Sequence, residues 1–544
     1  MHIICKNSGM KKTLLTTVCI LFFAQTAVFA QYESLANADK AGLYVRSIEE
    51  ALRLHPEQID LATATLIISE QWNKNVYGRR YLQRLDDMSF EIRDRLRAKR
   101  VGPNYRAIAV INEYLFDELG FTPVKKATNP GYLFLHSVLD EKRGHCLGLS
   151  ILYLSLAERL GLPLYGVVVP GHFFVRYDDG RVRFNIETTS KGGSAPDEHY
   201  INKFKVPETA HDSIYMVNLN KLETLGCFFN NLGNSYNDID DVEAALAALE
   251  TAVQINPSLG ESHMNLGNVY LKKGWVEDAI YEYQKALEIN PSEAKAHFNL
   301  GNGYAKRGWL NNAVSEYLES LELDPNCIEA YKGLATTYCK QEMFSQAIAQ
   351  LKQAIILKPK NSSLYNQLGN VYSQRGDYEK AILQYKKTLS IKPNLAEAYY
   401  GLAVCYNQLG RVDDEIQAYK RTLAIEPDML AALTNLGNAY FTKENYDAAI
   451  IQYKKAARIK PNEGTIFYNL GAAYSNKGDY EKAVAEYAKA VEIDPENADA
   501  HNGLAYGFYM LKNYESAWEH IKLAEELGAD IDKKLLDAIE TNLQ

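Results

Sequence analysis

The hexapeptide NLGNSY at residues 231–236 recurs, with small variations, throughout the C-terminal part of the chain. Prolines recur with the same spacing, one every 34 residues from Pro257 to Pro495. A fixed period of this length indicates a repeated helical unit that stacks on its neighbours to bury an apolar face. The related hexapeptides are NLGNVY, NLGNGY, QLGNVY, NLGNAY and NLGAAY, which begin at residues 265, 299, 367, 435 and 469, and GLATTY, GLAVCY and GLAYGF, which begin at residues 333, 401 and 503.

The composition of the unit predicts two helices. Each proline lacks an N–H donor and so ends the second helix. Glycine or alanine at the third hexapeptide position, and Ala245 and its counterparts in the second helix, allow the two helices to approach closely. Glu415 replaces that alanine in the sixth repeat and predicts looser packing there. We therefore predict nine tetratricopeptide repeats (TPRs) over residues 225–530, followed by a capping helix at residues 531–544.

Residues 31–224 show no such period. Apolar residues spaced near 3.6 in IDLATATLIISEQW and AIAVINEYLFDELG predict helices in its first part, whereas the sequence after Leu162 is typical of strands. An α+β domain is thus predicted ahead of an all-α solenoid.

Residues 1–30 combine three lysines with an apolar run that ends in Val28-Phe29-Ala30, which predicts a signal peptide cleaved before Gln31. We expect an exported protein, periplasmic or secreted, with no membrane anchor after cleavage. The remaining chain has 56 basic and 68 acidic residues, a formal charge of −12, which argues against nucleic acid as a partner. Its five scattered cysteines leave at least one thiol free, and we expect no cofactor.

The segment GHFFVRYDDGRVRFNIETT at residues 171–189 predicts a β-hairpin. Asp-Gly at residues 179–180 favours a two-residue turn, which pairs Asp178 with Arg181 and places His172 directly opposite Glu187. Such a pair lies roughly 5 Å apart at Cβ, so the carboxylate can orient the imidazole. Alternation along the strands gives an apolar core face with Phe173, Val175, Tyr177, Val182, Phe184 and Ile186, and a second face with His172, Phe174, Arg176, Arg183, Asn185 and Glu187.

Cys146 precedes LGLSILYLSLAERLG, a helical pattern, and is therefore predicted in the first turn of a helix. Free N–H groups and the helix dipole stabilise a thiolate and an oxyanion there. Together with His172 and Glu187, this cysteine supplies the groups needed for thiol acyl transfer. The alternatives are a buried cysteine, a structural histidine and a solvated glutamate. A metal site from Cys146, His145, His172 and His199 lacks a recognised ligand spacing, and we predict none.

The run RGHCLGLSILYLSLAERLGLPLYGVVVPGHFFVRYDDG, with NIETTSKGG after it and the helical segments before it, resembles the bacterial transglutaminase-like domain over most of residues 50–195. The resemblance implies a papain-like core with Cys146 as nucleophile, His172 as general base and acid, and Glu187 as the orienting acid. The reactions of that superfamily are amide crosslinking, deamidation and peptide hydrolysis.

The N-L-G-N register is similar to that of the repeats of O-linked N-acetylglucosamine transferases, in which a ladder of asparagines on the concave face holds an extended peptide. Gly333, Gly401 and Gly503 interrupt the ladder here. Alternatively, the ladder residues only cap or bridge neighbouring helices. The positions implied to bind peptide are Asn231, Asn265, Asn299, Gln367, Asn435 and Asn469.

These patterns predict an exported protein that joins a Cys-His-Glu acyl-transfer or amide-hydrolysing domain to a solenoid that binds a protein or extended peptide. A cysteine protease acting on cell-envelope proteins would use the same triad. The alternative of another class is a non-catalytic assembly scaffold, in which the transglutaminase-like fold only docks and the repeats bind a partner protein.

Overall fold

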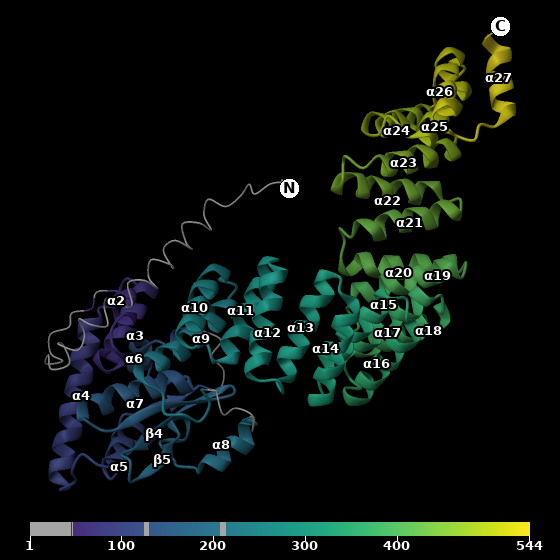
Figure 1. Cartoon of the computed structure of the whole chain (residues 1–544). Coiled ribbons are helices and arrows are strands. Elements are labelled where there is room, and N and C mark those ends of the chain that lie inside the picture. Colours follow the sequence, from purple (N-terminus) through teal and green to yellow (C-terminus); the bar gives the residue numbers. More distant parts are fainter. Residues whose placement is uncertain (1–44, 46, 125–129, 207–213, 544) are drawn as a thin grey trace, which may run out of the picture. The chain divides into compact units, whose positions relative to one another are not determined.

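The computed structural model describes residues 45, 47–124, 130–206 and 214–543 (Figure 1). The predicted signal peptide at residues 1–30 lies outside the described residues. The chain divides into two compact units, one up to Ser292 and one from Glu293. The first four repeat helices therefore belong to the same unit as the α+β region.

The N-terminal region begins with helices, as the apolar spacing predicts. The Asp60 side chain caps the helix of IDLATATLIISEQW by accepting from the backbone N–H of Thr63 at 2.6 Å. The elements up to residue 160 are α2 (Ile48–Leu52), η2 (Pro56–Gln58), α3 (Leu61–Trp72), α4 (Gly78–Ala98), α5 (Ala107–Asn112), the π-helix η3 (Glu113–Glu118), β1 (Thr122–Pro123), η4 (Pro130–Tyr132), α6 (Leu135–Glu141), β2 (Arg143–Gly144) and α7 (Cys146–Leu160). β1 and β2 form a short parallel pair.

Three antiparallel strands follow in the order β3 (Leu164–Val169), β4 (His172–Asp178) and β5 (Arg183–Ile186). The predicted register of β4 and β5 is wrong, because Asp178 pairs with Arg183 rather than with Arg181. A four-residue loop replaces the two-residue turn. Asp179 holds this loop, since its Oδ1 accepts from the backbone N–H of Arg181 at 2.9 Å and of Val182 at 2.7 Å.

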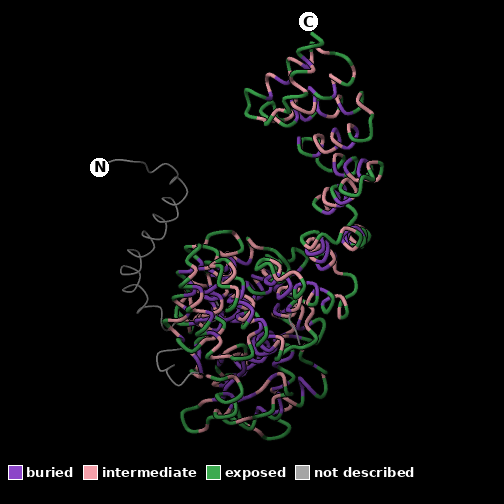
Figure 2. Tube along the Cα trace, turned by 90° about the vertical axis from the view of Figure 1, so that its right-hand side faces the viewer, coloured by how far each residue is buried: buried purple, intermediate pink, exposed green. Residues whose placement is uncertain are grey.

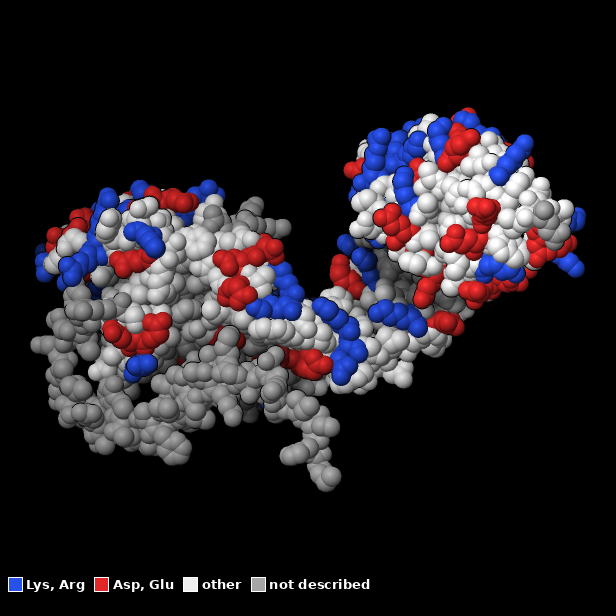
Figure 3. Space-filling model, turned by 90° about the horizontal axis from the view of Figure 1, so that it is seen from above, with Lys and Arg blue, Asp and Glu red and all other residues white. Residues whose placement is uncertain are grey.

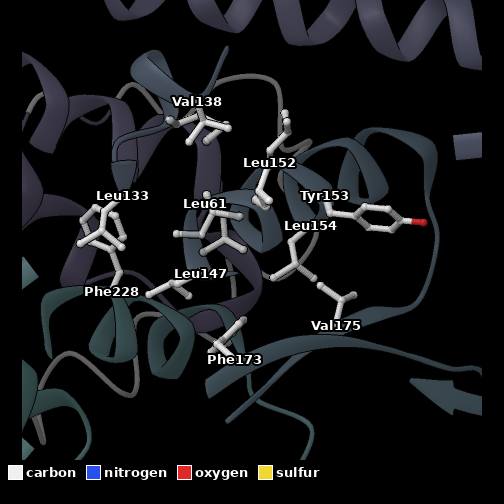
Figure 4. Packing of buried hydrophobic residues seen from close by; sticks show 14 of the residues in the cluster. Leu61, Leu133, Val138, Leu147, Leu152, Tyr153, Leu154, Phe173, Val175 and Phe228 are labelled. Carbon is white, nitrogen blue, oxygen red and sulfur yellow. The ribbon is translucent and has the colours of Figure 1, made fainter. Parts of the chain in front are cut away.

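A shift of two residues leaves every side chain on its predicted face, because side chains alternate with a period of two. Phe173, Val175 and Tyr177 are buried on the core face, together with Ile186. Leu61 of α3, Leu147 of α7 and Phe173 of β4 lie in one hydrophobic cluster (Figure 4), which also contains Phe228 of the first repeat. The first repeat thus contributes to the core of the α+β region.

The opposite face of the sheet is also covered. Phe174 stacks on Tyr200 of α8 (Asp197–Phe204), with ring centroids 4.0 Å apart. Arg176, which alternation places on this face, is fully buried. Its guanidinium donates to Asn185 Oδ1, to the Met216 carbonyl and to Asp197 Oδ1 at 2.7–2.8 Å. Burial is tolerated because these acceptors satisfy the charge.

The C-terminal region contains nine helix pairs, followed by α27 (Lys533–Leu543), whose Ile539 is buried in a cluster with Ile521. The pairs are α9 (Lys221–Asp238) and α10 (Val242–Ile255), α11 (Gly260–Lys273) and α12 (Val276–Ile289), α13 (Ala294–Arg307) and α14 (Leu310–Leu323), α15 (Ile328–Lys340) and α16 (Phe344–Leu357), α17 (Ser362–Arg375) and α18 (Tyr378–Ile391), α19 (Ala396–Gln408) and α20 (Val412–Ile425), α21 (Leu430–Thr442) and α22 (Tyr446–Ile459), α23 (Gly464–Lys477) and α24 (Tyr480–Ile493), and α25 (Ala498–Met510) and α26 (Tyr514–Glu526). Buried and exposed residues alternate along these helices (Figure 2).

A tyrosine–glycine contact sets the close approach within a repeat. A Cβ atom added to Gly471 would lie 2.6 Å from Cδ1 of Tyr487, a distance that real Cβ contacts do not reach. The fourth hexapeptide position supplies the acceptor for such tyrosines. The tyrosine hydroxyl donates to an asparagine 15 residues earlier at 2.7–2.8 Å in four repeats, through Tyr283 and Asn268, Tyr317 and Asn302, Tyr385 and Asn370, and Tyr453 and Asn438.

Glu415 occupies the position that is alanine in the other repeats. It is 2% exposed, and its Oε1 accepts from Asn407 Nδ2 at 3.1 Å. Burial raises the pKa of this carboxyl group above its usual value.

Lysine and arginine side chains lie among aspartate and glutamate side chains on the face seen in Figure 3. Among the residues that the structure describes, no helix is both long and apolar enough to cross a bilayer.

Candidate functional site

Cys146 is the first residue of α7, as the sequence predicts, and His145 is the N-cap residue. The His145 backbone N–H donates to the Tyr132 carbonyl at 3.0 Å, which fixes the start of the helix. Cys146 is 5% exposed, and its Sγ lies 3.4 Å from His145 Nδ1. The thiol therefore lies at a helix N-terminus, where unpaired N–H groups favour negative charge.

His172 is the first residue of β4 and follows Gly171, which has a φ of +70°. Its Nε2 lies 2.7 Å from Glu187 Oε2, and the two side chains are 13% and 14% exposed. The imidazole stacks on the Phe204 ring of α8, with centroids 4.8 Å apart and planes 5° apart. The ring is thus held by a carboxylate at one edge and by an aromatic face.

Glu187 lies just beyond β5 and caps the short helix η5 (Thr188–Ser190). Its Oε1 accepts from the backbone N–H of Thr189 at 3.0 Å and from the Thr189 hydroxyl at 2.5 Å. Thr188 donates to the Cys146 carbonyl at 3.4 Å, which ties this loop to α7. With the corrected register Glu187 is not directly opposite His172, but it reaches the imidazole by leaving the strand.

The ionisation of the three groups is coupled. Burial disfavours the Cys146 thiolate, but interactions with the imidazoles of His145 and His172 outweigh it and lower the pKa of Cys146 to about 6. Burial likewise opposes charge on His172, yet Cys146 and Glu187 raise its pKa to about 9. Hydrogen bonding to His172 keeps the pKa of Glu187 low despite burial. At neutral pH the site therefore favours a thiolate beside an imidazolium.

Two contributors were not predicted for this chemistry. His145, which the sequence suggested only as a metal ligand, contacts the thiol, and its pKa is raised by that contact despite burial. Asn112 donates to the Gly192 carbonyl at 3.1 Å and accepts from the Tyr153 hydroxyl at 2.8 Å, so it holds the loop after Glu187. The adjacency of His145 to Cys146 was visible in the sequence, whereas the Asn112 contact spans 80 residues. Within the described part of the chain, no three or more His, Cys, Asp or Glu residues cluster as metal ligands.

The ladder positions of the repeats mostly contact neighbouring helices. Asn265 Nδ2 donates to Asn230 Oδ1 at 3.0 Å, and Asn435 Nδ2 donates to the Tyr419 hydroxyl at 3.2 Å. Gln367 Nε2 donates to the Lys332 carbonyl at 3.1 Å, while its Oε1 is buried and has no hydrogen-bond partner among the described residues. The remaining three differ: Asn231 bonds within its own helix to the Cys227 carbonyl, Asn299 is 7% exposed, and Asn469 is half-buried.

Comparison with known proteins assigns a class to each region. Residues 79–214 match the family model described as the transglutaminase-like superfamily. TPR models match segments from residue 233 to residue 512. The chain therefore combines a transglutaminase-like domain with a TPR solenoid.

Curated relatives match only a short segment. A "UPF0162 protein" of Xylella fastidiosa is 38% identical over 76 residues, 13% of this chain and 27% of the relative. The mouse "F-box only protein 21" is 35% identical over 80 residues, 14% of this chain and 12% of that protein. This chain thus spans about a quarter or less of these relatives.

Solved structures match part of the chain. A structure of MamA protein is 31% identical, with a TM-score of 0.29, and the match covers 31% of this chain and 92% of MamA. A tetratricopeptide repeat protein from Parabacteroides merdae is 17% identical, with a TM-score of 0.35, and the match covers 46% of this chain and all of that protein.

Proposed function

We propose that the transglutaminase-like domain catalyses acyl transfer or amide hydrolysis through Cys146, His172 and Glu187. The observation that carries the proposal is the 2.7 Å contact of His172 with Glu187 next to a thiol whose pKa is lowered to about 6. Nucleophile, base and orienting acid are the groups that thiol acyl transfer needs.

In the proposed reaction the Cys146 thiolate attacks an amide carbonyl and forms a tetrahedral oxyanion, which N–H groups at the start of α7 stabilise. The His172 imidazolium gives its proton to the leaving amine as the C–N bond breaks, and a thioester remains. An incoming amine or water then attacks the thioester and gives a proton to His172. The C–S bond breaks, the Cys146 thiolate is released, and the product is a new amide or a carboxylic acid.

The repeats bind the protein or peptide that carries the amide. Stacked repeats present extended concave surfaces of the kind that bind proteins, which supports this role. We propose that the protein acts after export, in the periplasm or outside the cell, as its N-terminal sequence indicates.

Acylation by p-nitrophenyl acetate, followed by intact-protein mass spectrometry, tests the chemistry. At pH 6.5 the full chain should gain one acetyl group on Cys146 well before the half-buried Cys327 reacts. A primary amine should then speed loss of this acetyl group if the enzyme is a transferase. Cys146→Ser is the control that should not acylate rapidly, and equal reactivity of Cys146 and Cys327 would contradict the proposal.

A scaffold function is the second candidate, and the 5% exposure of Cys146 favours it. It predicts that Cys146→Ala leaves the biological activity intact, whereas substitution of Asn265 and Asn299 abolishes partner capture.

A further inference from the structure

The turn that carries His172 contacts the second repeat. The Gly171 backbone N–H donates to Glu261 Oε1 of α11 at 2.6 Å, across 90 residues of sequence. A carboxylate is the stronger kind of acceptor for a backbone N–H. Gly171 immediately precedes His172, so this bond acts on the backbone from which the imidazole extends.

The repeat helices are firmly attached to the same sheet. The Leu219 N–H donates to the Gly166 carbonyl of β3 at 2.9 Å, and the Met216 N–H donates to the Val168 carbonyl at 3.0 Å, so the chain enters α9 directly from the sheet edge. Lys221, the first residue of α9, forms an ion pair with Glu158 of α7. These contacts lie within one compact unit, which also contains α11.

The hydrophobic packing is continuous across this junction. One cluster of buried residues includes Leu147 of α7, Phe228 of α9 and Leu266 of α11. Trp72 of α3 also packs on Tyr236 of α9, with ring centroids 5.3 Å apart. Glu261 is therefore presented to the Gly171 turn from a fixed position rather than from a separate, loosely tethered module.

The imidazole of His172 has to face both Cys146 and Glu187. The neighbouring turn is a Pro170-Gly171 pair with a positive φ, and Gly171 has no side chain to hold it. A displacement of about 1 Å at a catalytic group can cost on the order of 100-fold in rate. The geometry points to Glu261 as a positioning residue: by accepting from the Gly171 N–H it fixes the His172 turn, so that the second repeat completes the catalytic site.

This inference rests on the proposed function, and a single series of full-length variants separates the two. The rate of Cys146 alkylation by iodoacetamide is measured against pH in the wild type and in the variants Glu261→Ala, Glu261→Gln and Glu329→Ala. Glu329 is exposed and lies two 34-residue periods after Glu261, at the equivalent position of α15. Circular dichroism and thermal unfolding check that each variant is folded.

We expect Glu261→Ala to shift the alkylation midpoint upward and to lower the rate at pH 6.5 by about tenfold, with little change at pH 10, where the Cys146 thiol is ionised in both proteins. Glu261→Gln keeps an acceptor oxygen without the charge and should retain most of the wild-type profile, and Glu329→Ala should match the wild type.

Three results would overturn the inference. If the alkylation rate of Glu261→Ala depends on pH as that of the wild type does, the positioning role is rejected while the proposed function stays intact. Equal shifts in Glu261→Ala and Glu261→Gln assign the effect to charge alone and reject positioning by the hydrogen bond. An ordinary thiol profile in the wild type itself rejects the proposed function, and the inference with it.

Discussion

The two regions of this protein follow from their sequences in different ways. In the repeats, a tyrosine and its asparagine acceptor are always 15 residues apart, as for Tyr453 and Asn438. In the transglutaminase-like domain, Cys146, His172 and Glu187 come from a helix, a strand and the segment after another strand. Local spacing determines the contacts of the first region, whereas non-local packing determines those of the second. Experiments that separate local from non-local contributions therefore test the comparison most sharply.

The largest expected effect is on the non-local site. His172→Ala should slow acetylation of Cys146 by p-nitrophenyl acetate at pH 6.5 on the order of 100-fold, because the thiol loses the imidazolium that stabilises its charge. Stopped-flow release of p-nitrophenolate measures the rate. The same variant should approach the wild-type rate near pH 10. A rate at pH 6.5 that matches the wild type would mean that His172 does not activate the thiol.

The next effect concerns packing inside a repeat. Gly471→Ala should lower the free energy of unfolding by about 1–3 kcal/mol, because its new Cβ would meet the Tyr487 ring at 2.6 Å. Gly464→Ala in the same helix is the matched control, since its Cβ would meet nothing closer than 3.4 Å. Urea titration of both variants measures the difference. Equal stabilities would show that this contact does not limit the approach of the two helices.

A smaller loss is expected from the tyrosine–asparagine bond. Tyr453→Phe should lower the free energy of unfolding by about 1 kcal/mol, since Asn438 loses the hydroxyl that donates to it at 2.7 Å. Tyr487→Phe offers a comparison, because Ala472 stands where the asparagine would be. In thermal unfolding, Tyr453→Phe should have a lower melting temperature than Tyr487→Phe. The reverse order would reject a stabilising role for the asparagine.

The smallest effect is a pH dependence from the sixth repeat. Burial raises the pKa of Glu415 above its unfolded value of about 4.5, so its folded form binds the proton more tightly. The stability that this provides is present below pH 4.5 and is lost as the pH rises through the folded pKa. Between pH 4.5 and 7.5 the melting temperature of Glu415→Gln should therefore fall less than that of the wild type. If the melting temperatures of the two proteins fell equally with pH, the raised pKa of Glu415 would be contradicted.

Much of the fold could be predicted because the decisive signals are local. The 34-residue period indicates the repeats, and alternation of apolar residues assigns Phe173 and Val175 to the core face. That assignment tolerates the register error, since the error is two residues and side chains alternate with a period of two. The register itself depends on Asp179, whose side chain accepts from two loop N–H groups, and the Asp-Gly pattern does not reveal that.

Fewer contacts of the candidate site could be predicted from the sequence. Alternation assigns Arg176 to the second face of the hairpin, but it does not reveal that Asp197 and Met216, which are distant in the sequence, accept hydrogen bonds from its guanidinium. The stacking of Phe204 on His172 and the contact of Glu261 with Gly171 also join segments that no local pattern connects. The catalytic roles of Cys146, His172 and Glu187 stay predictions, which the kinetic experiments test.

The most direct test of the central claim is the ultraviolet absorbance of the Cys146 thiolate as a function of pH. The signal is the difference between the wild type and Cys146→Ser, so the remaining thiols cancel. Burial raises the pKa of Cys227, Cys339 and Cys405, which keeps most of that background away from acidic pH. We expect a transition with a midpoint near the Cys146 pKa of about 6. A midpoint at or above the free-thiol value of about 8.5 would contradict an activated nucleophile.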